Sequence, residues 1–425
     1  MLLPAAAARA DFLPSRPIAF WNDRLVISGD ATVTIGQPDH GYFNSLDYYH
    51  DALNLARFGL AIELKANERI AVLGQVIDQI ALRSGSSPDA WSDETTPPIW
   101  DPFETNRHIV RPYALFVRVR PFLDKPVTVQ AGRIPPVFGA YVTQEYYGAS
   151  QPLISTPLAY HYPTTIRPDA VVRSSAALAR WRGGGWRVRY RTGSDNWAQG
   201  VPIVNALRWD TGVQVKVGDA GPVEVSAAVT AGTLSSPQFD DDNDGKQISG
   251  RAVFRPATGL VIGVSGAHGD FVSDSLIAAL PPETAATGRS YTQQAIGADV
   301  EYSRGYWLLR SETIVTSWKV PAVEAPYLDE PLRAWSTFLE GRYRLTPRLY
   351  VAARGEYLGF SKIQAGLEYD FQRVTWDGPV TRVEVGTGYS IQRNVRLKLT
   401  YQYDWRDAGS TRRRGALATQ IGYWF

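Results

Sequence analysis

The sequence predicts an all-β fold, a transmembrane antiparallel β-barrel with about eighteen strands, or sixteen as the alternative. Three observations support this fold. Apolar and polar residues alternate in segments of about ten residues. Short turns alternate with long polar loops, and no run approaches the roughly 18 apolar residues of a membrane helix. An apolar face backed by ionised groups suits a strand between lipid and a watery lumen.

Composition agrees with such a barrel and excludes other classes. The 425 residues include no cysteine, which excludes disulfides and thiolate metal sites. Hydrophobic residues make up an ordinary 44%, as expected when alternation hides the apolar face. A net charge of +2 predicts no bulk attraction to nucleic acid.

The N-terminus carries features of an export signal. Ala8-Arg9-Ala10 before Asp11 has the small-x-small form of a cleavage site. We therefore expect a signal-peptide remnant at 1–10, a short periplasmic segment at 11–20 and the barrel over 21–425. An alanine-rich terminus without a targeting role is the alternative.

Alternating segments and turns then follow one another along the whole chain. Tight turns are predicted at 66–69, 123–126, 218–221, 304–305 and 392–394, with longer polar loops between the hairpins. The strands are expected at 25–35, 58–64, 70–76, 113–119, 127–131, a pair turned at 183–185, 207–217, 223–229, 248–254, 260–264, 296–302, 307–315, 335–343, 349–353, 383–389, 395–405 and 417–425. Short turns mark the periplasmic end and long loops the extracellular end.

The sides of these strands follow from alternation. Residues expected to face lipid include Trp209, Val213, Val215, Leu397, Leu399 and Ile421. Arg208, Lys216, Arg396 and Lys398 are expected to face water.

One loop, 134–169, is the candidate constriction of the lumen. It contains six prolines and five tyrosines, enough apolar bulk to fold. Loops of this length are usually functional or disordered. We expect it to bend into the lumen, and an external cap on neighbouring loops is the alternative.

Two segments resemble known families. The terminal strand, with Tyr423 and Phe425, resembles the closing strand of bacterial outer-membrane barrels, which implies an assembly signal read by the barrel-assembly machinery. Residues 131–139 are similar to a segment of phosphate-selective-type porins, in which a strand runs into a Pro-Phe-Gly-like turn. That resemblance implies a ladder of inward arginines with Arg133 at its mouth. The chain departs from the family in lacking a lysine-rich constriction cluster.

Inward positions are rich in arginine. The predicted pore-lining set is Arg118, Arg120, Arg133, Arg187, Arg189, Arg191, Arg208, Arg251, Arg342, Arg344, Arg354 and Arg396. The inward acids are Glu63, Asp210, Glu224, Glu312, Glu340, Glu356, Glu384 and Asp404.

Arg187, Arg189 and Arg191 are predicted to form a local ladder. Residues two apart on a strand project to the same face about 7 Å from each other. Such rings of guanidinium groups favour anions in pores. Pairing of the arginines with acids on neighbouring strands is the alternative.

Catalytic and metal motifs are incomplete. The five histidines are scattered, and Gly263-Val264-Ser265-Gly266 lacks the spacing of a nucleophile elbow. Asp240, Asp242 and Asp244 match the start of a calcium loop, but Arg251 stands where the twelfth-position Glu belongs. An acidic surface loop is the favoured interpretation.

The expected protein is therefore a passive porin of a Gram-negative outer membrane. It is not an enzyme, needs no cofactor, contacts outer-membrane lipids and mildly favours anions. A homotrimer is one expected assembly. The alternative is a scaffolding barrel whose lumen a partner protein occupies, as in secretion or electron-transfer assemblies.

Overall fold

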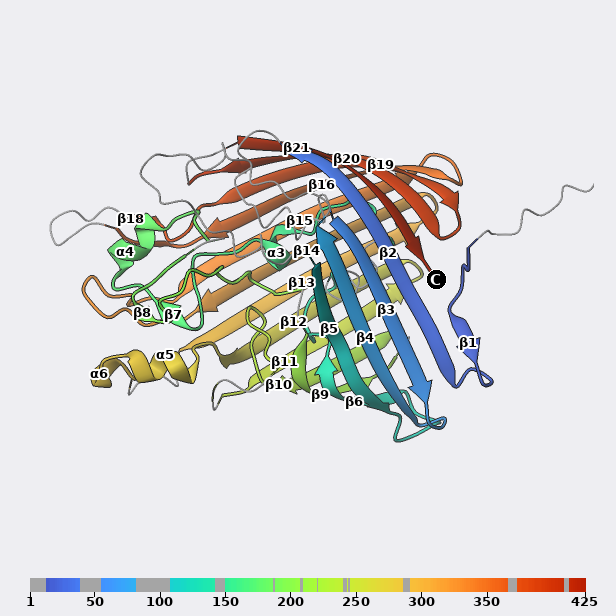
Figure 1. The fold of residues 1–425 in the computed structure, drawn as a ribbon, viewed down its shortest axis with the longest axis horizontal. Helices are drawn as coiled ribbons and strands as arrows, with labels where there is room; N and C mark the ends of the chain where they lie inside the picture. Colours follow the sequence, from blue (N-terminus) through green and yellow to red (C-terminus); the bar gives the residue numbers. More distant parts are fainter. Residues whose placement is uncertain are drawn as a thin grey trace, which may run out of the picture.

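The computed structural model is a closed barrel of sixteen antiparallel strands (Figure 1). It describes residues 13–38, 55–81, 108–141, 150–185, 188–206, 209–219, 221–239, 243, 245–285, 291–365, 373–408 and 413–425. In ring order the strands are β2 (Leu25–Pro38), β3 (Leu55–Lys65), β4 (Ile70–Ala81), β5 (His108–Val119), β6 (Val127–Ile134), β9 (Asp210–Val217), β10 (Val223–Thr230), β11 (Gln247–Ala257), β12 (Leu260–Asp270), β13 (Thr292–Arg304), β14 (Trp307–Trp318), β15 (Leu332–Arg344), β16 (Leu349–Phe360), β19 (Val380–Gln392), β20 (Val395–Arg406) and β21 (Arg413–Trp424).

Smaller elements complete the fold. A short strand β1 (Ile18–Phe20) pairs with β2 beside the barrel, and two small hairpins lie outside the main sheet, β7 (Ala170–Val171) with β8 (Thr192–Gly193) and β17 (Lys362–Gln364) with β18 (Arg373–Thr375). The described helices are short: α3 (Leu158–His161), α4 (Ser175–Arg180), α5 (Asp274–Ala279) and α6 (Pro282–Ala285). Among the described residues, no helix is long and apolar enough to cross a membrane.

The strand number corrects the first expectation of eighteen and agrees with the alternative of sixteen. The two predicted strands around Gly183–Gly185 account for the difference, because that region connects β6 to β9 and contributes no strand to the barrel. Residues 188–191 still alternate between buried and exposed. Any extended segment with one side against a core shows this pattern, so alternation alone did not identify a barrel strand.

The two faces of the sheet have the predicted polarity. Val213, Val215, Leu397, Leu399 and Ile421 lie on the outer face with 40–49% of their surface exposed. Lys398 lies on the inner face and is fully buried. An outward apolar band is the surface that a bilayer requires.

Trp209 is an exception to the predicted polarity. It precedes β9, is buried, and packs against Tyr113 with 4.8 Å between the ring centroids. Trp209 comes just before the first paired residue of β9. Its side chain therefore need not follow the alternation of the strand. Arg208, its predicted inward neighbour, lies outside the described residues.

The two ends of the barrel differ. Long connections and the helices α4, α5 and α6 lie at the left of Figure 1, whereas short turns and the C-terminus lie at the right. We call these the long-loop end and the short-turn end. Successive connections between the strands lie alternately at the two ends. The position of a residue along its strand therefore gives its depth along the barrel axis.

Phe425 closes the ring at the short-turn end. Its backbone N–H donates to the Gly29 carbonyl at 2.9 Å, and the Gly29 N–H donates to the Phe425 carbonyl at 3.1 Å. A Cβ at Gly29 would lie 3.0 Å from the Phe425 ring, so glycine leaves room for that ring. The rings of Tyr423 and Phe425 stack with 5.7 Å between centroids.

Deleting Phe425 should therefore reduce the yield of assembled barrel. The deletion removes two closing backbone hydrogen bonds and the ring over Gly29. Heat-modifiable mobility on gels measures the assembled fraction, and secreted precursor levels measure export. Phe425→Tyr keeps the ring and both bonds and should assemble normally. An unchanged yield after the deletion would contradict the role of Phe425.

Residues 135–209, which we call the inserted segment, fold against the inner face of the barrel. Its described part buries Leu158, Ile203 and Val204 in one core with inward side chains of β13–β19, such as Phe338 and Leu358. Helix α3 packs on β15 and β16. The long-loop half of the lumen is thus occupied by the chain's own side chains.

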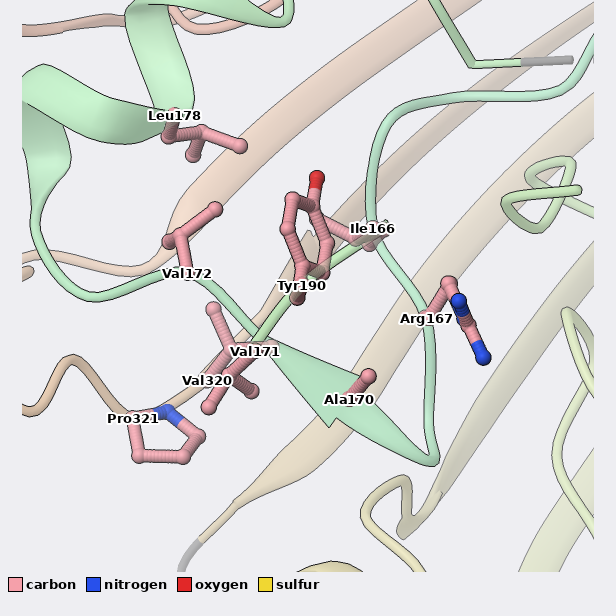
Figure 2. A pocket seen from close by; sticks show the side chains of 9 residues that line it. All are labelled: Ile166, Arg167, Ala170, Val171, Val172, Leu178, Tyr190, Val320 and Pro321. Carbon is pink, nitrogen blue, oxygen red and sulfur yellow. The ribbon is translucent and has the colours of Figure 1, made fainter. Parts of the chain in front are cut away.

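A small apolar pocket remains within the inserted segment, shown in Figure 2. It is lined by Ile166, Val171 and Leu178, and Val320 and Pro321 close it from the connection after β14. Arg167 borders the pocket but turns its guanidinium to Asp169, at 2.7 Å.

Candidate functional site

Carboxylates of two neighbouring strands hold the backbone of the inserted segment. Glu384 on β19 accepts the backbone N–H groups of Ile154 at 3.1 Å and Ser155 at 3.2 Å. Glu356 on β16 accepts the N–H of Leu158 at 2.7 Å. Hydrogen bonds to an ionised carboxylate are roughly twice as strong as neutral ones. The inserted segment is therefore fixed to the wall at a defined depth.

Arg354 on β16 joins these carboxylates into one network. Its guanidinium lies 2.7 Å from Glu356, 3.0 Å from Glu384 and 3.2 Å from Glu340. It also donates to the Ser155 carbonyl at 2.6 Å. The Arg354 side chain is 1% exposed. One buried cation thus contacts three carboxylates of the wall and the backbone of the inserted segment. The network therefore stabilises the wall and the inserted segment together.

Further polar groups fix the inserted segment on either side of this network. Tyr160 donates its hydroxyl to Glu312 at 2.6 Å, and the Ala140 N–H reaches the same carboxylate at 2.9 Å. Arg382, paired with Asp404 at 2.8 Å, faces the same region from β19 and β20. These groups extend the anchoring across five strands.

Asp377, in the connection between β16 and β19, holds the far part of the inserted segment. Its carboxylate accepts the N–H groups of Thr165 at 2.8 Å and Gly183 at 2.7 Å. Burial raises the pKa of Asp377, and the N–H donors oppose that rise. Gly183 has φ of +74°, a conformation that suits glycine at this contact.

A separate group of arginines lies nearer the short-turn end. Arg342 and Arg344 project inward from β15, and Arg396 projects inward from β20. The guanidinium carbons of Arg342 and Arg396 lie 5.9 and 5.4 Å from the centroid of the Tyr350 ring. We call these three arginines with Tyr350 the Tyr350 arginine group.

Among the described residues, no carboxylate pairs with Arg342, Arg344 or Arg396. Arg396 donates to the Ser150 carbonyl at 2.8 Å. The Nε atoms of Arg342 and Arg396 are buried without a hydrogen-bond partner. Buried unsatisfied donors are costly, so an anion that accepted from them would be favoured there.

A glycine shapes the wall beside this group. Gly388 on β19 pairs with Tyr350, and a Cβ at Gly388 would lie within 2.1 Å of the Tyr350 ring. The ring therefore lies across Gly388, between Arg342 and Arg396. Its hydroxyl donates to the Pro152 carbonyl at 2.8 Å, which ties the group to the inserted segment.

The inward acids, in contrast, are occupied. Glu63 pairs with Arg118, Glu224 with Lys216 at 3.0 Å, and Asp404 with Arg382. Asp210 accepts the N–H groups of Thr211 and Gly232, and the four glutamates of β14, β15, β16 and β19 bind Tyr160, Arg354 and the inserted segment. Basic partners thus account for six of these eight acids, whereas Asp210 and Glu312 accept hydrogen bonds from backbone N–H groups and from Tyr160. None of the eight forms an ion pair with the Tyr350 arginine group.

The other predicted pore-lining arginines occupy different positions. Arg118 and Arg251 are inward but paired, Arg251 with Asp299 at 2.6 Å. Arg120 is exposed just after β5 at the short-turn end. Arg187 lies outside the described residues, as do the calcium candidates Asp240, Asp242 and Asp244.

The predicted ladder on one strand is wrong. Arg189 and Arg191 are exposed on the inserted segment rather than on a barrel strand, and Arg189 pairs with Asp195 at 2.8 Å. That hydrogen bond lowers the pKa of Asp195. The chain here lies against the core of the inserted segment, which explains the alternation without a lumen wall.

Arg133 also departs from the prediction. It pairs in register with Leu115 and Thr211 on the outer face, and its guanidinium lies 5.4 Å from the Phe239 ring centroid. Gly132, with φ of +126°, precedes it, and register places Gly132 rather than Arg133 on the inner face. The resemblance that put Arg133 at the mouth of a ladder therefore does not extend to its orientation.

Sequence reasoning missed Tyr350, Ser155 and Asp377. Tyr350 is a tyrosine on an inward position, and only the glycine opposite it on β19 indicates that its ring lies along the wall. Ser155 and Asp377 lie in connections, where alternation carries no information.

Solved structures with this fold are bacterial outer-membrane porins. An anion-selective porin from Comamonas acidovorans is 9% identical, with 94% of this chain and 99% of that chain covered and a TM-score of 0.52. OmpF of Salmonella typhi in complex with daunomycin is 12% identical, with 96% and 100% covered and a TM-score of 0.52. No protein-family model and no curated protein matches the chain. The predicted likeness to outer-membrane porins is thus confirmed for the fold.

Proposed function

We propose that this barrel is a porin of a bacterial outer membrane, through which small hydrophilic solutes diffuse, and that it favours anions. The observation that carries the anion preference is the Tyr350 arginine group, three inward guanidinium groups that pair with no carboxylate in the described part of the chain. Passive diffusion requires neither a cofactor nor catalytic residues.

The shape of the barrel supports a narrow channel. A barrel of sixteen strands is too wide for its wall side chains alone to fill the lumen. The inserted segment narrows the long-loop half, anchored through Glu356, Glu384 and Arg354. It also takes up the space that a partner protein would need, so we favour the channel over a scaffold around a partner.

Electrostatics supports the sign of the selectivity. Guanidinium groups within a Debye length, about 8 Å at physiological salt, attract anions and repel cations. Acids that are already paired contribute little opposing field. A narrow passage beside Arg342, Arg344 and Arg396 should therefore favour chloride over potassium, and more strongly at low salt.

Replacing Arg342 and Arg396 by glutamine should reduce the anion preference. The change removes two positive charges from the lumen wall without removing an ion pair. The reversal potential of single channels in a KCl gradient measures the chloride-to-potassium permeability ratio, which should fall by at least about twofold at 0.1 M salt. The difference should shrink at 1 M salt, where the Debye length is about 3 Å.

The matched control is the double variant Arg189→Gln and Arg191→Gln. It removes the same charge from exposed positions on the inserted segment and should leave the reversal potential unchanged. A wild-type channel that prefers potassium would overturn the proposal. Equal effects of both double variants would assign the selectivity to net charge rather than to the Tyr350 arginine group.

We also retain, as predictions, a homotrimer and contacts with outer-membrane lipids and the assembly machinery. Sedimentation in detergent measures the number of copies, and the apolar outer face of β2–β5 is one surface available for such contacts.

A further inference from the structure

Four basic side chains gather outside the lumen, at the long-loop end of β14–β16. Arg333 is exposed on the outer face of β15, opposite Ser317. Lys319 follows β14 on the same face, which makes it a diagonal neighbour of Arg333 across the two strands. Lys362 and Arg373 are exposed on the β17–β18 hairpin. We call these four residues the outer basic patch.

Backbone hydrogen bonds bring the members of the patch together. The Arg333 N–H donates to the Ser361 hydroxyl at 3.1 Å, and the Ser361 N–H donates to the Arg333 carbonyl at 2.9 Å. The Trp376 indole N–H reaches the same carbonyl at 2.8 Å. Arg373 donates to the Lys362 carbonyl at 3.3 Å. The hairpin is therefore held next to the end of β15.

An aromatic residue lies directly below the patch. Trp335, two residues from Arg333 on the same outer face, is 38% exposed. A Cβ at Gly359 would lie 2.5 Å from the Trp335 ring, so the ring lies across β16 at that glycine. Tryptophan is enriched at the boundary between hydrocarbon and headgroups. Arg333 and Lys319 lie nearer the long-loop end than Trp335, and this places them at the depth of the lipid headgroups.

Among the described residues, positive charge exceeds negative charge around the patch. None of its four members forms an ion pair with another described residue, whereas nearby Arg173 pairs with Glu324 at 2.8 Å. Two exposed acids, Asp329 and Glu330, lie in the connection before β15 and pair with none of the four. Counted over the described residues, this region holds four cations and two acids.

We propose that the outer basic patch binds the phosphate of an anionic lipid headgroup in the leaflet at the long-loop end. Basic clusters beside a membrane surface recognise anionic headgroups, and each cation near the surface strengthens binding by about fivefold. The hydroxyls of Ser317 and Ser361, on either side of Arg333, are available as additional hydrogen-bonding groups. This inference is independent of the anion preference of the lumen, because Arg342 and Arg396 lie on the opposite face of the sheet.

Native mass spectrometry of the full chain in a non-ionic detergent tests the proposal. Phosphatidic acid supplies the phosphate headgroup, and phosphatidylcholine supplies the same acyl chains with a zwitterionic headgroup. The wild-type barrel should retain phosphatidic acid preferentially. The double variant Lys319→Gln and Arg333→Gln should weaken that binding by about 25-fold, at about fivefold for each charge removed. Heat-modifiable mobility verifies that the variant is folded.

The matched control is Arg304→Gln with Arg348→Gln, two exposed arginines at the short-turn end. It should bind phosphatidic acid as the wild type does. Equal loss in both double variants, or equal retention of both lipids, would overturn the proposal. Inorganic phosphate at millimolar concentration should not displace the lipid. Displacement would identify a free anion as the ligand and would overturn the assignment to a lipid.

Discussion

Replacing Arg354 by methionine should destabilise the barrel more than any other single substitution in the wall of its lumen. The substitution leaves Glu340, Glu356 and Glu384 buried together without the cation that contacts all three. Removing one partner from a buried ion pair typically costs about 3–5 kcal/mol, because the remaining charge is uncompensated. The Ser155 carbonyl also loses its donor, so the inserted segment should loosen as well.

The temperature at which heat-modifiable mobility is lost measures this effect, and current noise in bilayers measures the loosening. Arg118→Met is the control, since the Arg118–Glu63 pair is about one quarter exposed and such pairs contribute about 1 kcal/mol or less. Adding Glu384→Gln to Arg354→Met should recover part of the loss. If Arg354→Met and Arg118→Met lost heat-modifiable mobility at the same temperature, the buried network would not be what holds the inserted segment.

The architecture was predictable because a spanning strand has a strict requirement. Every backbone group must pair within the sheet, and each strand must present alternate residues to lipid and to water. Val213 and Leu397 obey that requirement, so their orientation follows from sequence. β21 pairs with β2 and closes the ring for the same reason, since an unpaired edge is not tolerated in the bilayer.

The inserted segment was predictable only in part. Its proline and tyrosine content indicated a folded loop, but the loop was expected to end at 169, whereas it continues to Trp209. Tyr190 shows why: it alternates with exposed neighbours as a barrel residue would, yet it is buried in the core of the segment. An alternation of apolar and polar residues shows that one side of an extended segment is buried. It does not show whether lipid or protein covers that side.

The prediction of which arginines are available to solutes failed for a different reason. Arg342 and Arg354 are both inward arginines, two residues from a glutamate on their own strands. Only Arg354 pairs with its neighbouring glutamate, because the three-dimensional register also brings Glu340 and Glu384 to it. Which arginine remains available for solutes therefore depends on cross-strand neighbours, which a single strand does not reveal.

Removing the inserted segment should produce the largest functional change. Ile134 and Asp210 are directly paired across β6 and β9, so an Asn-Gly turn can join the two strands in place of residues 135–209. The long-loop half of the lumen then loses the side chains that fill it, and single-channel conductance should rise at least about threefold, toward that of an unobstructed barrel of this strand number. Thermal stability should fall, because inward Phe338 and Leu358 lose their apolar partners.

The anion preference should survive this deletion in a weakened form. Arg342, Arg344 and Arg396 remain on the wall, but a wider lumen places more of the passage beyond a Debye length from them. A deletion of 274–285, which removes α5 and α6 from another long connection, is the control and should leave conductance nearly unchanged. If the 135–209 deletion left conductance unchanged in a folded barrel, the constriction would lie elsewhere, and the short-turn half with its arginines would be the place to seek it.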